Sequence, residues 1–145
     1  MFAHMLLPTD GSDFSEAAII KGLGLAKEVK AKVTGVSVTP RFHTFSLDPT
    51  MIQDTQTQFE TDSRAQAQKC LDFLTRTAAE QGVPCETVIE VNDHPYAAII
   101  EVAERRNCDL ILMASHGRRG MQAMLLGSET QKVLTHTKIP VLVYR

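Results

Sequence analysis

Short apolar segments alternate along this chain with segments in which apolar residues recur at helical spacing. Pro8 ends the first apolar segment and Pro40 follows the second, which is typical of strands. Strands that alternate with helices form parallel sheets with right-handed crossovers and with helices on both faces. The sequence therefore predicts an α/β fold with a five-stranded parallel sheet. The expected strands cover residues 2–7, 32–38, 83–91, 109–113 and 139–144.

The segments between the strands have the spacing of amphipathic helices. We expect helices over residues 14–29, 59–82 and 95–103, and a last helix after residue 127. Pro95 stands at an early helical position, where its missing amide does no harm. The polar residues 41–50 are expected to form a loop, and residues 41–58 could cover a site as a lid.

Length and charge limit the kinds of protein to consider. The 145 residues suit one domain with its own core, so a single domain over residues 1–145 is expected. The formal charge of -2 gives no general attraction to nucleic acid or to an anionic membrane, so we expect neither as a partner. No stretch approaches the roughly 20 apolar residues that span a bilayer. Any anion site must be local.

The three cysteines give no sign of a crosslink or of a zinc site. Cys70, Cys85 and Cys108 are odd in number and form no CxxC pair.

The first ten residues, MFAHMLLPTD, carry no basic region, and Pro8 and Asp10 interrupt their apolar run, so no signal peptide is expected. We therefore expect the protein in the reducing cytoplasm.

The loops after the first and fourth strands are the expected place for a ligand. In open parallel sheets, ligands lie beyond the carboxyl ends of the strands, where the strand order reverses. The first and fourth strands are the natural neighbours at that point. Their exits read PTDGSD at residues 8–13 and MASHGRRG at residues 113–120.

The longer segment MASHGRRGMQAMLLGSETQKVL has the features of an anion-binding loop. Its glycines leave backbone amides uncovered, and Gly127 and Ser128 stand where a helix begins with unpaired N–H groups. Arg118 and Arg119 add positive charge, and the Ser128 hydroxyl can donate to a phosphate oxygen. These residues predict a phosphate site.

The same residues also have a structural interpretation. Ser128 and Gln131 have the spacing of a capping box, in which the serine caps the helix and the glutamine reaches back. Arginines on loops are commonly solvated, and glycines are common near helix starts. Neither a GxxxxGK[ST] nor a GxGxxG at the first helix is present, so a P-loop or dinucleotide fold is not expected. Spacing alone leaves both interpretations open.

Three quoted segments together resemble a known family. LLPTDGSDFSEAA at residues 6–18, the glycine-containing loop at residues 113–134 and the terminal IPVLVYR are similar to the universal stress protein family over essentially the whole chain. The resemblance implies a Rossmann-like fold of the adenine nucleotide alpha hydrolase-like type, which usually dimerises. Its ATP-binding branch carries GxxG, nine residues and G[ST]. Here Gly117 is followed by nine residues and then by Gly127 and Ser128, while Ala114 replaces the first glycine.

Ala114 has two possible consequences. If its position requires a left-handed backbone, alanine costs about 1 to 2 kcal/mol relative to glycine, and its methyl group could crowd a phosphate. If the backbone is ordinary, alanine is harmless.

The resemblance implies a site for ATP, together with Mg²⁺ or Mn²⁺. Asp10 would lie near the ribose or a phosphate-bound metal, and the end of the second strand would meet the adenine. His116 has a simpler interpretation as a polar loop residue. The implied nucleotide-binding residues are Pro8, Thr9, Asp10, Ser37, Val38, Met113, Ala114, Gly117, Arg118, Gly127, Ser128 and Glu129.

The leading hypothesis is a regulatory stress-response protein that binds ATP and is not an enzyme. The five histidines are scattered, and neither HExxH nor GxSxG is present, although slow ATP hydrolysis stays open. The alternative is a dimeric interaction module of the same fold that binds no nucleotide. In either case a homodimer would form through the last apolar strand, from Ile139 to Tyr144, whose edge position would invite pairing. The physiological protein partner is unknown.

Overall fold

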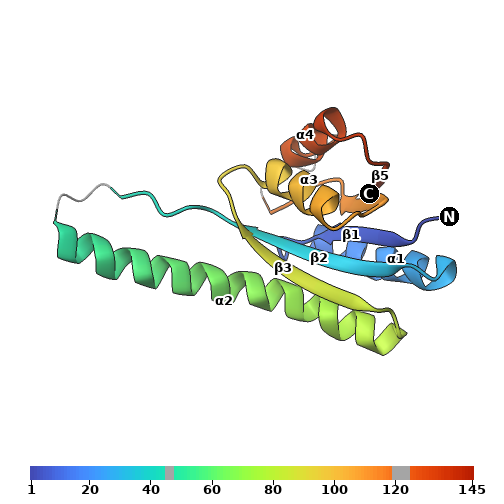
Figure 1. Ribbon diagram of the computed structural model, residues 1–145, viewed down its shortest axis with the longest axis horizontal. Helices are drawn as coiled ribbons and strands as arrows, with labels where there is room; N and C mark the ends of the chain where they lie inside the picture. Colours follow the sequence, from blue (N-terminus) through green and yellow to red (C-terminus); the bar gives the residue numbers. More distant parts are fainter. Residues whose placement is uncertain (45–47, 119–124) are drawn as a thin grey trace.

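A parallel five-stranded sheet forms the centre of the protein, as the sequence predicts. The computed structural model describes residues 1–44, 48–118 and 125–145. In these residues the strand order is β3-β2-β1-β4-β5, and every neighbouring pair is parallel (Figure 1). The strands are β1 His4–Pro8, β2 Lys32–Thr39, β3 Cys85–Val91, β4 Leu110–Ala114 and β5 Val141–Tyr144.

Helices cover both faces of this sheet. Residues on one face, such as Leu7, pack in one core cluster with Leu23 of α1 and Leu74 of α2. The neighbouring residue Leu6 points to the other face and joins the cluster that contains Val102 of α3 and Val133 of α4. This alternation is the two-residue period of a strand that is buried on both sides. The helices are α1 Asp13–Val29, α2 Pro49–Gln81, α3 Pro95–Arg105 and α4 Ser128–His136.

The sheet order places β1 and β4 side by side at its centre. Met5 and Leu6 of β1 pair with Leu110 and Ile111 of β4, which confirms the expected neighbours. β1 continues into α1 on one face, whereas β4 leads towards α4 on the other face. The two connections therefore diverge at the carboxyl ends of these strands. Such a divergence opens the crevice in which doubly wound folds bind ligands.

α2 begins earlier than its apolar spacing indicates. Asp48 caps the helix by accepting from the amide of Thr50 at 2.9 Å, and Pro49 occupies the first turn. No residue of α2 before Ala67 is buried, and Figure 1 shows this part projecting past the sheet. Pro49 and Thr50 are therefore helical and not part of the expected loop, while the lid over residues 41–58 stays a prediction.

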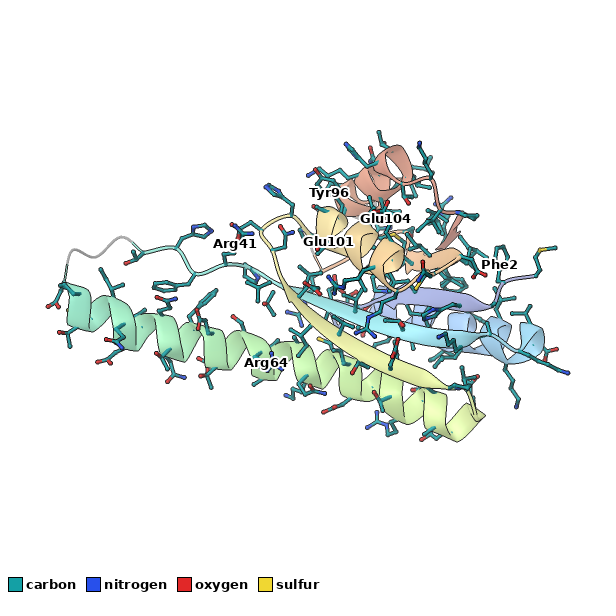
Figure 2. All side chains as sticks on the ribbon, in the orientation of Figure 1. Phe2, Arg41, Arg64, Tyr96, Glu101 and Glu104 are labelled. Atoms are coloured by element: carbon teal, nitrogen blue, oxygen red, sulfur yellow. The ribbon has the colours of Figure 1, made fainter. Side chains whose placement is uncertain are left out.

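A physical reason for this early start lies in polar pairs. Gln56 donates to Glu60 at 2.9 Å, and Gln58 donates to Asp62 at 2.8 Å, each four residues apart. Such pairs stabilise an exposed helix without any apolar repeat. Figure 2 shows side chains standing out from α2 around Arg64 in this half of the helix.

Polar contacts fasten the amino ends of the strands. The Asp109 carboxylate accepts from the amides of Ala3 at 2.8 Å and His4 at 3.0 Å. The buried His4 ring meets the Thr34 hydroxyl at 2.7 Å, and Thr34 in turn donates to Glu86 at 3.0 Å. These contacts lie at the amino ends of the strands, on the side of the sheet opposite the loops that follow the carboxyl ends. In the described ranges, no helix has the length and apolar character that a bilayer crossing requires.

Candidate functional site

Short polar contacts shape the loop after β1. Pro8 is the last residue of β1, and the buried Thr9 still donates its amide to Val36 of β2 at 2.9 Å. The Thr9 hydroxyl meets the Ser15 hydroxyl at 3.1 Å and accepts from the Gly11 amide at 3.1 Å. Gly11 has a φ of +78°, which glycine adopts without strain. The loop is therefore fixed tightly against the start of α1.

Asp10 joins the loop after β1 to the loop after β4. Its carboxylate accepts from the Ser12 amide at 2.9 Å and from the Arg118 amide at 2.8 Å. A Cβ atom built on Gly117 would lie 2.5 Å from Asp10 Oδ2, so only glycine leaves room for this contact. Burial alone would raise the pKa of Asp10, but the hydrogen bonds from Ser12 and Arg118 bring that pKa below its usual value. Asp10 is therefore a carboxylate at neutral pH.

The Arg118 side chain lies over the same loop. A Cβ atom built on Gly11 would lie 3.1 Å from Arg118 Nη2 and 2.7 Å from Cys70 Sγ of α2. Burial raises the pKa of the Cys70 thiol, which keeps the thiol neutral. The charged groups at this position are thus Arg118 and Asp10. The predicted contribution of Arg119 lies outside the described residues.

The loop returns to β4 at Gly127. The Gly127 amide donates to Ser115 O at 2.7 Å. A Cβ atom built on Gly127 would lie 3.1 Å from that oxygen, 3.3 Å from His116 Cα and 3.9 Å from Gly117 N. The two glycines of the sequence pattern, ten positions apart in the chain, are thus neighbours in space.

The capping-box interpretation of Ser128, which the spacing left open, is wrong. α4 begins at Ser128 itself, with Gly127 as the N-cap and without a side-chain cap hydrogen bond. The Gln131 side-chain Nε2 atom donates to Leu126 O at 3.0 Å, whereas a capping box would have the glutamine oxygen accept from the Ser128 amide. The cap falls one residue earlier because the glycine backbone packs directly on Ser115. The first turn of α4 therefore starts beside the glycine pair, with the Ser128 hydroxyl on its exposed first residue.

Glu129 has a structural contact that its position in the sequence did not suggest. Its Oε2 atom accepts from the Tyr96 amide at 2.8 Å, in the first turn of α3. The N-cap of α3, His94, makes no side-chain cap bond, so Glu129 supplies this cap from α4. The Tyr96 ring packs against His136 of α4 with centroids 5.0 Å apart. Figure 2 shows Tyr96 at the start of α3, below α4.

The strand residues implied for the site lie at the carboxyl ends of β2 and β4. Ser37 is buried and Val38 half-buried near the end of β2, and Met113 and Ala114 are buried at the end of β4. Among the described residues, positive φ values outside glycine occur only at Lys30 and Asn107. Ala114 therefore has an ordinary strand backbone, and the cost of a left-handed conformation does not arise. Its side chain belongs to the core cluster on the α1 and α2 face.

Three buried polar residues support the loop and were not predicted as site residues. The Thr130 hydroxyl donates to Ala114 O at 3.0 Å and holds α4 against the exit of β4. Ser115 Oγ meets His116 Nδ1 at 2.9 Å, and the His116 ring lies 5.6 Å from Phe14. His116 is a polar loop residue, as its simpler interpretation has it, and it is buried. The one available signal for Thr130 was its place in the first turn after Gly127.

Comparisons with known proteins agree with this architecture. The profile of the universal stress protein family matches residues 1–145. The universal stress protein YxiE of Bacillus subtilis is 32% identical over 149 residues, which cover 100% of both chains. The solved structure of a hypothetical protein of Methanocaldococcus jannaschii has a TM-score of 0.80 at 25% identity and covers 99% of this chain and 95% of that one.

Two solved structures with lower identity share the fold and were determined with nucleotides. A universal stress protein in complex with cAMP has a TM-score of 0.65 at 21% identity, with coverage of 99% of this chain and 97% of that one. The universal stress protein from Archaeoglobus fulgidus in complex with dAMP has a TM-score of 0.67 at 16% identity, with coverage of 100% and 98%. The match of the family profile to every residue from the first to the last makes this chain a member of the universal stress protein family.

Proposed function

We propose that this protein is a regulatory stress-response protein that binds an adenine nucleotide, with the phosphates at the glycine pair. The close approach of Gly127 to Gly117 carries the proposal, since a Cβ atom built on Gly127 would lie 3.9 Å from Gly117 N. It gathers backbone amides from two separate segments at the start of α4. Amides and a helix N-terminus of this kind suit phosphate oxygens. Family members solved with cAMP and dAMP support an adenine nucleotide as the ligand.

The residues present also fit ATP with a divalent cation. Arg118 supplies a fixed positive charge beside the loop, and the exposed Ser128 hydroxyl supplies a donor. Asp10 adds a negative charge close to the same amides, so a polyphosphate here would require a cation such as Mg²⁺ or Mn²⁺ to reduce the repulsion. The proposed nucleotide would extend past Pro8 and Thr9, with its base near Ser37 and Val38.

Release and rebinding of nucleotide test this proposal directly. Freshly purified protein is heated, and the released small molecules are identified by mass spectrometry. Calorimetry with Mg²⁺ and ATP then measures affinity for the emptied protein. Ser128→Ala removes one donor to an anion and should weaken the affinity about tenfold. Thr135→Ala, on the exposed last turn of the same helix, is the matched control and should leave it unchanged. If no nucleotide is released and no binding is measured, the proposal is overturned.

We further propose that the protein binds nucleotide without catalytic turnover. Regulation by occupancy requires only that the loops differ between the bound and free forms. A steady release of phosphate from ATP that disappears in Asp10→Ala would instead indicate a slow ATPase.

A second candidate is a homodimeric interaction module. β5 lies at the edge of the sheet and pairs with β4 on one side. The Leu142 side chain of this strand is 39% exposed. Leu134 of α4 is also 41% exposed. An apolar edge strand offers unpaired backbone groups and apolar area to a second copy. We propose a homodimer through residues 139–144. A monomer in sedimentation experiments at micromolar concentration would exclude it.

The proposed location is the cytoplasm. The three cysteines are all free thiols in the structure, which is the usual state in a reducing compartment. Fluorescence microscopy of a tagged chain in its own cell would test this location.

A further inference from the structure

The Asp10 carboxylate already acts as an anion at the loop where the proposed function puts phosphate. Asp10 Oδ2 accepts from the Arg118 amide at 2.8 Å and fills the space above Gly117. Gly117 and Arg118 are adjacent residues of the glycine-containing loop. The contact reaches across 108 positions in the sequence, so it is not a local turn. It joins the exits of the two central strands.

A phosphate oxygen and this carboxylate compete for the same donor. A backbone amide donates one hydrogen bond, and the Arg118 amide gives its bond to Asp10. A phosphate that approached while Asp10 kept this position would also meet a second negative charge at short range. Asp10 can withdraw from Arg118 without losing all of its partners, because Oδ1 is held separately by the Ser12 amide at 2.9 Å.

We infer that Asp10 is an internal competitor of the nucleotide and that phosphate binding displaces its carboxylate from the Arg118 amide. This inference rests on the proposed function. When the site is empty, Asp10 holds the two loops together and keeps the amide paired. When nucleotide binds, the contact opens and the loop after β4 becomes independent of the loop after β1. Asp10 thereby disfavours a metal-free polyphosphate and makes a charge-neutralised nucleotide the preferred ligand.

Neutralisation of Asp10 separates this role from a simple attractive contact. Calorimetry compares ATP in excess EDTA with ATP in saturating Mg²⁺ for the wild type, Asp10→Asn and Asp13→Asn. Asp13 is the matched control because it is an exposed acid three residues away, at the start of α1. Asp10→Asn should strengthen the binding of metal-free ATP about tenfold, as expected for removal of a charge about 5 Å from a phosphate at a partly solvated site. Asp13→Asn should change it less than about twofold.

A second measurement uses the nucleotide-free protein. Amide hydrogen exchange followed by NMR should show a protected Arg118 amide in the wild type and in Asp13→Asn. Protection should fall at least about tenfold in Asp10→Ala, because the acceptor is gone. Addition of Mg²⁺ and ATP to the wild type should shift the Arg118 and Ser12 amide resonances together, since both bonds depend on the same carboxylate.

The outcomes distinguish this inference from the proposed function. Equal loss of affinity for both forms of ATP in Asp10→Asn would overturn the inference alone, because Asp10 would then attract the ligand. An unchanged ratio between the two forms, or an unprotected Arg118 amide in the wild type, would also overturn it alone. Failure of the wild type to bind either form would overturn the proposed function and the inference with it.

Discussion

Replacement of Gly127 by alanine tests whether the return of the loop to β4 depends on the absence of a side chain. The new Cβ atom would lie 3.1 Å from Ser115 O and 3.3 Å from His116 Cα. Both are backbone atoms at a buried strand exit, so neither can turn away as the end of a side chain would. The φ and ψ values of Gly127 are -68° and 157°, which any residue can adopt. The penalty therefore comes from space and not from backbone strain.

The expected loss follows from the overpacking of one methyl group. Insertion of a methyl group into packed atoms costs about 1 to 3 kcal/mol, and alanine is also a poorer N-cap than glycine. We expect the free energy of unfolding to fall by about 2 kcal/mol, which lowers Tm by about 4 to 8 °C in a chain of this size. Gly24→Ala is the matched control, because a Cβ atom there meets nothing within 4 Å. In the interior of α1 this alanine should stabilise the protein by up to about 1 kcal/mol.

Urea unfolding followed by far-ultraviolet circular dichroism measures both variants against the wild type, with a comparison of midpoints and slopes. If Gly127→Ala is as stable as the wild type to within about 0.5 kcal/mol, the close approach to Ser115 does not constrain the loop. The reasoning would also fail if Gly24→Ala were the more damaging of the two.

Three further changes test other contacts. Glu129→Ala should remove the cap on the Tyr96 amide and lower the free energy of unfolding in urea by about 1 kcal/mol. Glu129→Gln should retain part of this stabilisation, because its side-chain oxygen can still accept. Equal stability of the wild type and both variants would refute the cap. Burial lowers the pKa of His4, and the charge of Lys32 lowers it further, so the unfolded chain takes up a proton before the folded protein does. Stability should therefore decrease as the pH falls below about 6.5, and this part of the pH dependence should vanish in His4→Gln when Tm is measured from pH 8 to 5. Leu142→Lys, at the exposed edge of β5, should convert the proposed dimer to a monomer in sedimentation velocity.

The arrangement of the sheet was predictable because its pattern is local and repeated. The central strand β4, residues 110–114, carries a continuous apolar run that is buried on both faces, whereas the edge strand β3 shows polar residues between its apolar ones. The alternation of strands and helices leaves few topologies, and the order that puts β1 beside β4 follows from right-handed crossovers. The glycine spacing likewise located the loop, since Gly117 and Gly127 do meet in space.

Contacts between distant segments were not predictable from spacing. The start of α2 depends on Asp48 and on glutamine pairs, which leave no apolar repeat to detect. Ser128 fits a capping box by composition, but the backbone contact of Gly127 with Ser115 decides where α4 begins. The contact of Asp10 with the Arg118 amide joins two loops whose relative position only the fold determines. The assigned nucleotide contacts themselves remain predictions.

The position of Tyr96 also makes the protein suitable for optical measurement. The chain contains no tryptophan and two tyrosines, so its tyrosine fluorescence comes from Tyr96 and Tyr144 and is not obscured by tryptophan. Tyr96 lies between α3 and α4, with its amide on Glu129 and the Lys132 ammonium 5.6 Å from its ring centroid. Tyr144 pairs with Ala114, and its carbonyl accepts from the Ser115 amide at 2.8 Å. Both tyrosines therefore contact α4 or β4, the two elements that flank the glycine-containing loop. Their fluorescence in the unlabelled protein should respond to changes in the position of these two elements.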